Sequence, residues 1–188
     1  MLAPHAARFL RGRVLNGANE LQIRRLAASD SLAELTRLLH RAYATLAAKG
    51  FNYTAVDQNE SATRRQIESR ECYVGFIAGR MIASLLLGSA VPEQLACEWY
   101  RRQGIWIIGR FAVEPTLQGQ GIGSQMLSFA ERRAQSLGAL ETAVDTAEGA
   151  QHLIQLYEKR GYRHVGHVQW EGKNYRSVVL SKTLTHGD

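Results

Sequence analysis

The sequence predicts a single α/β domain with a mixed central sheet of about seven strands flanked by about four helices. Strand-like and helix-like segments alternate along the chain, which is the pattern of a sheet covered by helices. The clearest segment, residues 105–113, is an apolar run rich in β-branched and aromatic residues, as expected of a strand buried on both faces. A glycine-rich loop and an amphipathic helical pattern follow it directly.

The 188 residues suit one domain with a sizeable core, which we place at residues 20–184. Residues 1–19 contain three arginines and no acidic residue, a composition also found in targeting presequences. They lack serine, however, and Pro4, Gly12 and Gly17 would interrupt a helix. We therefore expect a leader or an irregular N-terminal extension there, and a short tail at residues 185–188.

The composition is that of an ordinary soluble globular protein, with 45% hydrophobic residues and a mean hydropathy of -0.23. No apolar run approaches the roughly 20 residues that would cross a bilayer, so no membrane association is expected. Cys72 and Cys97 are the only cysteines and lack a C-x-x-C spacing, which supports neither a disulfide framework nor a metal site. A reducing cytoplasm is the simplest location.

The net charge is +6 and the sequence pI is about 9.6. Most of the basic residues are arginines, and several occur in pairs, such as Arg24-Arg25 and Arg132-Arg133. The pairs are scattered along the chain rather than gathered in one segment. This pattern favours a generally basic surface over a dedicated nucleic-acid face, so nucleic acid is not expected as a partner.

The first third of the domain shows clear boundary signals. Residues 21–26 alternate as a strand does. Ser31 and Glu34 make a capping box, which begins a helix that we expect to end at Gly50. The inward stripe of this helix consists of Leu32, Leu35, Leu39, Ala42 and Leu46. A second helix is predicted over about residues 61–69.

Two strands, residues 72–78 and 81–88, are predicted to form a hairpin across Gly79-Arg80. Residues 89–104 interrupt the pattern with a polar, partly helical insertion. After the central strand and helix, residues 139–145 predict a strand, and residues 151–160 predict a helix that ends at Gly161. Residues 162–170 and 175–182 predict two closing strands.

The loop between the central strand and its helix contains Gly119, Gly121 and Gly123. The helix after it has an apolar stripe, with Glu131 off the stripe; the stripe comprises Ile122, Met126, Leu127, Ala130, Ala134 and Leu137. Unpaired amides at a helix N-terminus favour an anion, and glycines let it approach the backbone. A tight turn without a ligand is the simpler alternative. The spacing matches neither the Walker nor the dinucleotide pattern.

Two motifs give this loop a specific resemblance. The run Val113-x-Pro115-x-x-Gln118-Gly119-Gln120-Gly121-Ile122-Gly123 resembles the acetyl-CoA loop of the GNAT superfamily of N-acetyltransferases. Roughly thirty residues later, the run from Leu156 and Tyr157 to Gly161 and Tyr162 resembles the second signature of that superfamily. The resemblance covers about residues 20–184. It implies a GNAT-like fold and acetyl-CoA as co-substrate.

The resemblance also implies how the cofactor is held. The strands of residues 105–113 and 139–145 should splay apart, so that the pantetheine arm enters between them. The backbone of Phe111, Ala112 and Val113 would pair with the pantetheine amides. The pyrophosphate would be cradled by Gln118, Gly119, Gln120, Gly121, Ile122, Gly123 and Ser124. One departure is Ala150, where the superfamily often carries an asparagine that contacts CoA.

For the chemistry, the resemblance places Tyr157 near the cofactor sulfur, as general acid or hydrogen-bond donor; a half-buried core tyrosine is the alternative. A phenol suits this role because its pKa of about 10 keeps it protonated near neutrality. Asp145 is the candidate general base, and His152 or Glu98 are alternatives. A capping carboxylate, a surface imidazole or a water relay would explain these residues equally well.

The acceptor side is least determined by the sequence. In the GNAT superfamily the first helix pair and its linking loop wall the acceptor site, which makes Phe51 and Tyr53 candidate substrate contacts; aromatics closing the edge of the core are the alternative. The insertion with Trp99 and Tyr100 is either an acceptor-site flap or a surface loop. We expect direct acetyl transfer to a small-molecule or peptide primary amine in a ternary complex. A non-catalytic acyl-CoA sensor and an aminoacyl-tRNA acetyltransferase are alternatives, and a homodimer is possible.

Overall fold

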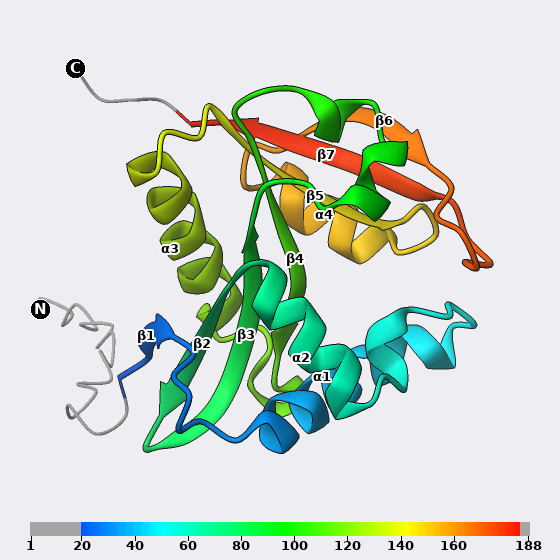
Figure 1. Cartoon of the computed structure of the whole chain (residues 1–188). Coiled ribbons are helices and arrows are strands. Elements are labelled where there is room, and N and C mark those ends of the chain that lie inside the picture. Colours follow the sequence, from blue (N-terminus) through cyan, green and yellow to red (C-terminus); the bar gives the residue numbers. More distant parts are fainter. Residues whose placement is uncertain (1–19, 185–188) are drawn as a thin grey trace, which may run out of the picture.

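The computed structural model describes residues 20–184, which form a single α/β domain (Figure 1). Its seven-stranded mixed sheet has the order β1-β2-β3-β4-β5-β7-β6. The strands are β1 (Gln22–Arg25), β2 (Glu71–Ile77), β3 (Arg80–Gly88), β4 (Ile105–Val113), β5 (Glu141–Ala147), β6 (Arg163–Val168) and β7 (Ser177–Thr183). The α-helices are α1 (Leu32–Ala48), α2 (Glu60–Ser69), α3 (Ile122–Ser136) and α4 (Gln151–Glu158). The predicted fold class and element order are confirmed.

Helices cover both faces of the sheet. On one face, Met126 and Leu127 of α3 and Tyr157 of α4 belong to one buried cluster with side chains of β3, β5 and β7. On the other face, Leu35 and Leu38 of α1 pack with residues of β2 and β3. No helix in residues 20–184 is long and apolar enough to cross a membrane. The leader and the tail expected at residues 1–19 and 185–188 lie outside the described residues.

Helix α1 begins and ends where the sequence predicts. The Ser31 hydroxyl accepts a hydrogen bond from the Glu34 N–H at 3.2 Å, which caps the first turn. At the other end, Gly50 has a φ of +87° and donates to the Ala47 carbonyl, while the Phe51 N–H donates to the Leu46 carbonyl. These two bonds form a Schellman motif, which glycine favours because it has no β-carbon.

The β2–β3 turn lies one residue earlier than predicted. Ile77 pairs with Arg80, so the turn residues are Ala78 and Gly79 rather than Gly79 and Arg80. Both have positive φ, +49° at Ala78 and +75° at Gly79. This is the geometry of a type I′ turn, whose twist matches that of the flanking strands.

The predicted stripe of α3 is wrong at two positions. Glu131, expected outside the stripe, is only 8% exposed, whereas Leu137 is 40% exposed. Glu131 is buried because it has partners: Lys182 Nζ lies 2.7 Å from Oε2, and the Tyr162 hydroxyl donates to Oε1 at 3.2 Å. Leu137 lies past the end of the helix, which ends at Ser136. Periodicity alone did not reveal either partner.

Gly104 and Gly138, which precede β4 and β5, offer a matched test of packing at the N-terminal ends of these two strands. Both have positive φ, but a β-carbon on Gly104 would lie 2.7 Å from Leu140 Cγ, whereas one on Gly138 would meet nothing within 4 Å. We expect Gly138→Ala to lower the free energy of unfolding by about 1 kcal/mol, from backbone strain alone. Gly104→Ala should cost roughly 1–3 kcal/mol more, because it also overpacks against Leu140. Urea denaturation measures both; equal losses would contradict the packing argument.

Candidate active site

The centre of the molecule is a gap between two parallel strands. β4 and β5 pair only through Ile105–Ile107 and Glu141–Ala143. Beyond these residues β4 continues to Val113 and β5 to Ala147 without further pairing to each other. The carboxyl ends of the two strands therefore diverge, as the expected splay requires, and in open α/β sheets such a parting is where ligands bind.

A bulge in β4 lies beside this gap. Ala112 pairs with Ser84 and Gly109 with Leu86, so Arg110 and Phe111 together face Leu85 on β3. Arg110 has a φ of +47°, in the left-handed region that residues with a β-carbon seldom adopt. A bulge adds one residue to one strand and re-aims its side chains. Here Phe111 packs with the core on the α3 side, whereas Arg110 lies against residues of α1 and α2.

The end of β4 turns backbone groups toward the gap. The Glu114 N–H donates to the Ile82 carbonyl of β3, so alternation along the strand directs the N–H and C=O of Val113 away from β3. The side-chain amide of Gln118 donates to the Val113 carbonyl at 3.1 Å. Gln118 thus fastens the following loop to the end of the strand.

The glycine loop leaves a run of backbone N–H groups unpaired. Gly119 and Gly121 have φ of +76° and +84°, and Gly121 caps α3 without a side-chain hydrogen bond. None of the backbone N–H groups of residues 119–124 donates a hydrogen bond to residues 20–184. A β-carbon on Gly123 would lie 3.3 Å from Phe111 Cζ, so a larger residue there would press on the bulge. This arrangement suits phosphate groups.

Tyr157 reaches the gap from α4. Its side chain is 6% exposed, and its ring packs against Tyr162 with centroids 5.6 Å apart. Burial raises its pKa well above the ordinary value, and Tyr43 and Asp145, from the opposite side of the sheet, act in the same direction. Its hydroxyl makes no hydrogen bond with the described residues. The phenol therefore stays protonated near neutrality and has no hydrogen-bond partner among the described residues.

Asp145 lies on β5 where the strand has parted from β4. Its two carboxylate oxygens are held by different donors: the Tyr100 hydroxyl at 3.0 Å and the Trp170 indole N–H at 2.8 Å. The carboxylate also helps to raise the pKa of Tyr100 well above its ordinary value, although burial is the larger cause. Asp145 is therefore fixed in orientation, and each oxygen keeps a lone pair for another donor.

The fold and this geometry agree with the comparison to known proteins. The family model described as the acetyltransferase (GNAT) family matches residues 32–162. The chain belongs to the GNAT family. It is accordingly an acyltransferase, and the resemblance seen in the glycine loop and in the run around Tyr157 is confirmed at the level of the family.

Three proteins, one compared by sequence and two by structure, illustrate what this chain is similar to. The S-(2-succino)cysteine N-acetyltransferase of Bacillus subtilis (strain 168) is 29% identical over 164 residues, 86% of this chain and 96% of that protein. A solved protein of Pyrococcus horikoshii OT3 has a TM-score of 0.69 at 18% identity, covering 89% of this chain and 100% of that one. A Bacillus subtilis acetyltransferase in complex with CoA has a TM-score of 0.63 at 21% identity, covering 88% and 100%.

Phe51 and Tyr53 lie at the end of β5, in a cluster of aromatic side chains. The Tyr53 hydroxyl accepts from the Ala147 N–H at 2.7 Å and bonds the Thr146 hydroxyl at 3.0 Å. The ring of Tyr175 lies 4.7 Å from that of Tyr53. Both predicted residues also line an open depression of about 470 Å³ between the loop after α1 and Lys173. Phe51 and Tyr53 therefore close the edge of the core and also border this depression.

The other candidate bases lie farther from this arrangement. His152 is exposed at the start of α4, and burial and the charge of Lys49 lower its pKa. Glu98 is exposed in the insertion, which folds into two 3-10 helices, Pro92–Ala96 and Trp99–Arg101. Tyr100 of the same insertion is buried and donates to Asp145, so this part of the insertion belongs to the site wall.

A set of asparagine hydrogen bonds, which the sequence did not suggest, joins two distant loops. Asn52 Nδ2 donates to the Gly172 carbonyl at 2.8 Å, and the Asn174 N–H donates to Asn52 Oδ1 at 3.0 Å. Lys173 Nζ donates to the Asn52 carbonyl at 2.8 Å. These bonds fasten the α1–α2 loop to the β6–β7 turn beside the depression that Asn52 and Lys173 line.

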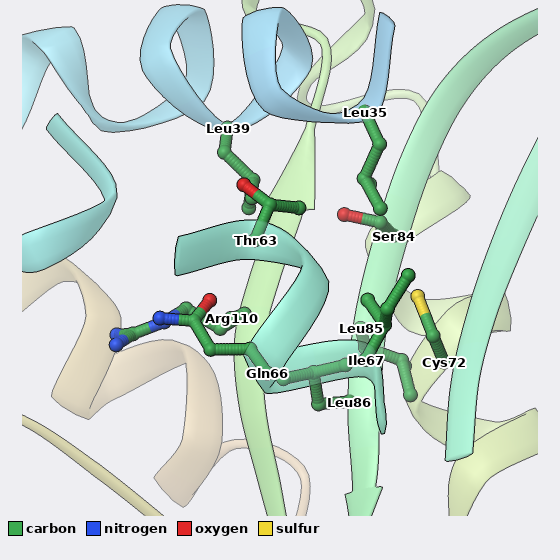
Figure 2. A pocket seen from close by; sticks show the side chains of 10 residues that line it. All are labelled: Leu35, Leu39, Thr63, Gln66, Ile67, Cys72, Ser84, Leu85, Leu86 and Arg110. Carbon is green, nitrogen blue, oxygen red and sulfur yellow. The ribbon is translucent and has the colours of Figure 1, made fainter. Parts of the chain in front are cut away.

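Two arginines of the site were also missed. Arg70 follows α2, and its Nη1 lies 3.6 Å from the position that a β-carbon on Gly109 would take. Arg110 lies at the bulge and lines a cavity of about 10 Å³, room for one water, whose other walls are mostly apolar. In Figure 2 the Arg110 guanidinium points away from Leu35, Leu85 and Cys72. The available signal was a single arginine within the apolar run 105–113.

Tyr53 allows a test of whether its hydroxyl supports the fold. Tyr53→Phe leaves the buried Ala147 N–H without its acceptor, so we expect a loss of about 1–3 kcal/mol in the free energy of unfolding, measured by urea denaturation. Tyr175→Phe is the control, because its hydroxyl makes no hydrogen bond within residues 20–184. An unchanged stability together with a raised KM for the acceptor would instead assign the Tyr53 hydroxyl to substrate binding.

Proposed function

We propose that this enzyme transfers the acetyl group of acetyl-CoA directly to a primary amine while both substrates are bound. The observation that carries the proposal is the parted pair β4 and β5, which opens toward the unpaired amides of residues 119–124 on one face. Asp145 lies on the parted end of β5, and Tyr53, which borders the depression, is hydrogen-bonded to Thr146 and Ala147 of the same strand. Two substrates can thus meet from opposite sides of one sheet.

The cofactor lies along β4 in this proposal. The amides of residues 119–124 hold the pyrophosphate, with Gly119 and Gly121 supplying the positive φ that the loop needs. The backbone of Phe111, Ala112 and Val113 accepts the pantetheine arm as an added strand. A Bacillus subtilis acetyltransferase of the same fold was solved in complex with CoA, which supports CoA as the ligand.

The reaction balances without a further reactant. The amine nitrogen attacks the thioester carbonyl carbon, the carbon–sulfur bond breaks, and CoA leaves as a thiolate that takes up a proton. The Tyr157 phenol donates to the departing sulfur, since its raised pKa keeps the proton on the oxygen until the sulfur carries charge. The Val113 N–H, turned toward the gap, is the nearest candidate to stabilise the carbonyl oxygen.

Asp145 orients the acceptor amine. The Tyr100 and Trp170 hydrogen bonds fix both carboxylate oxygens, which leaves one lone pair on each to accept from an ammonium group. The ammonium proton then passes to Asp145 or to a water beside it before the nitrogen attacks. The named substrate of the Bacillus subtilis relative, S-(2-succino)cysteine, is an amino-acid derivative with a primary amine, which supports a small acceptor of this kind.

Calorimetric titration with acetyl-CoA, followed by detection of thiol release with a panel of amines, tests the proposal. We expect selective acetyl-CoA binding over NAD and ATP, and CoA release that depends on the amine. Folded protein that neither binds acetyl-CoA nor acetylates any amine would overturn the proposal. Binding of acetyl-CoA without turnover would favour a sensor.

Tyr157→Phe separates the proposed donor role from packing. The variant keeps the buried ring, so acetyl-CoA affinity and the free energy of unfolding should stay near those of the wild type. We expect kcat to fall roughly 10²–10⁴-fold because the departing thiolate loses its proton donor. Because the pKa of Tyr157 is raised, wild-type kcat should show no fall from this group as the pH rises to about 10. An unchanged kcat would remove Tyr157 from the mechanism.

The glycine loop gives a second prediction. Gly121→Val forces a β-branched residue into a φ of +84° and displaces the amides that face the phosphates, so the Kd for acetyl-CoA should rise roughly 10- to 100-fold. Gln120→Ala is the control, because its exposed side chain makes only a 3.4 Å bond to the Thr116 carbonyl. Calorimetry measures both. Equal effects of the two substitutions would contradict a backbone cradle.

A further inference from the structure

Two arginines meet beside the gap without any partner from residues 20–184. The Nε atoms of Arg70 and Arg110 are buried and make no hydrogen bond, and neither side chain forms an ion pair with a described residue. Buried polar groups in proteins are almost always paired, so two buried Nε atoms without partners on neighbouring arginines need an explanation. Arginine is also the side chain best suited to bind a planar anion through two parallel hydrogen bonds.

The backbone is arranged to bring these two side chains together. The stem of Arg70 lies across Gly88, where a β-carbon would come within 3.1 Å of its Cγ, and its guanidinium reaches Gly109. Arg110 follows Gly109 directly, and its φ of +47° belongs to the bulge that faces Leu85. A regular strand would have placed residue 110 differently. Strain of this kind persists where it serves a site.

The surrounding charges leave an anion to be supplied from outside. Asp145 and Glu93 act on Arg70 only at a distance, and neither carboxylate of these described residues forms an ion pair with it. Burial lowers the pKa of the Arg70 guanidinium, and the charge of Arg110 lowers it further. Lys173, at the edge of the depression, also lies within the field of Arg110. Positive charge is thus concentrated on the acceptor side of the gap.

We propose that Arg70 and Arg110 form a carboxylate-binding subsite, and that the acceptor is therefore an amine that carries a carboxylate group. The inference rests on the proposed acetyltransferase function and names its substrate class. Asp145 holds the ammonium end of such a molecule, and the two guanidinium groups hold the carboxylate end. The opposite charges of the site match those of an amino acid or an amino-acid derivative and reject amines without an acidic group.

The test compares acceptors that differ only in the carboxylate. Phenylalanine is paired with phenethylamine, and S-(2-succino)cysteine with its all-amide analogue, and kcat/KM is measured by CoA release. We expect the carboxylate member of each pair to be preferred in the wild type. Arg70→Gln and Arg110→Gln should each lower kcat/KM for the carboxylate acceptors roughly 10- to 150-fold, the loss of a charged hydrogen bond, and leave the amide and amine acceptors nearly unchanged.

Two controls separate recognition from packing and from cofactor binding. Arg65→Gln alters an exposed arginine of α2 and should leave every rate near the wild-type value. Because neither orphaned Nε has a partner, Arg70→Gln should not lower the melting temperature; a large fall would assign Arg70 to stability. A raised Kd for acetyl-CoA in either variant would assign the pair to the cofactor phosphates and overturn the proposal.

The outcome is also separable from failure of the proposed function. Preferred acetylation of phenethylamine, with acetyl-CoA binding intact, would overturn the carboxylate subsite and leave the acetyltransferase standing. If none of the four acceptors is turned over, succinate serves as the probe in calorimetry on the acetyl-CoA complex. Succinate binding that is lost in the Arg70→Gln/Arg110→Gln double variant supports the subsite; no succinate binding overturns it.

Discussion

The early end of the β4–β5 ladder is the constraint on which the rest of the site depends. Three residue pairs join the strands, and beyond them neither strand pairs with the other. A backbone N–H or C=O group buried without a hydrogen-bond partner destabilises a protein, unless a side chain or another molecule bonds to it. The family to which the chain belongs uses a CoA thioester, whose pantetheine amides have the spacing of a strand. The gap is thus a missing strand, and the proposed cofactor replaces it.

The gap also explains why the two faces of the sheet differ. On the α3 side, Phe111 and Tyr157 join a continuous apolar cluster, and the loop at the start of α3 is the polar end of that face. On the α1 side, Arg70, Arg110 and Asp145 lie where the core thins between separate clusters. The bulge at Arg110 shifts the alternation of β4, so that Ile108 and Phe111, three residues apart, both face the α3 side, and Arg110 faces α1 and α2. The surfaces proposed for cofactor and acceptor are therefore chemically distinct.

Local signals in the sequence predicted the elements and the glycine loop well. The cap at Ser31, the stop at Gly50 and the strand 105–113 follow from short-range chemistry, which a single sequence contains. The buried Glu131 and the asparagine bonds between Asn52 and Asn174 depend on partners far along the chain, which periodicity does not encode. The predicted role of Tyr157 rests on the family resemblance and that of Asp145 on its place at the end of a strand, and the structure adds their surroundings.

The arginine pair shows most clearly why the acceptor side escaped prediction. An arginine within an apolar strand contradicts the pattern around it, and such local conflicts in natural proteins concentrate at functional sites. Its meaning depends on a bulge, on two glycines that make room for Arg70, and on a second charge from another element. Two adjacent like charges with buried, unpaired Nε atoms destabilise the empty site, and the surrounding sheet must hold them. A bound carboxylate would offset the repulsion between the two charges and would accept hydrogen bonds from the unpaired Nε atoms. The arrangement that destabilises the free enzyme would therefore raise its affinity for an acidic acceptor.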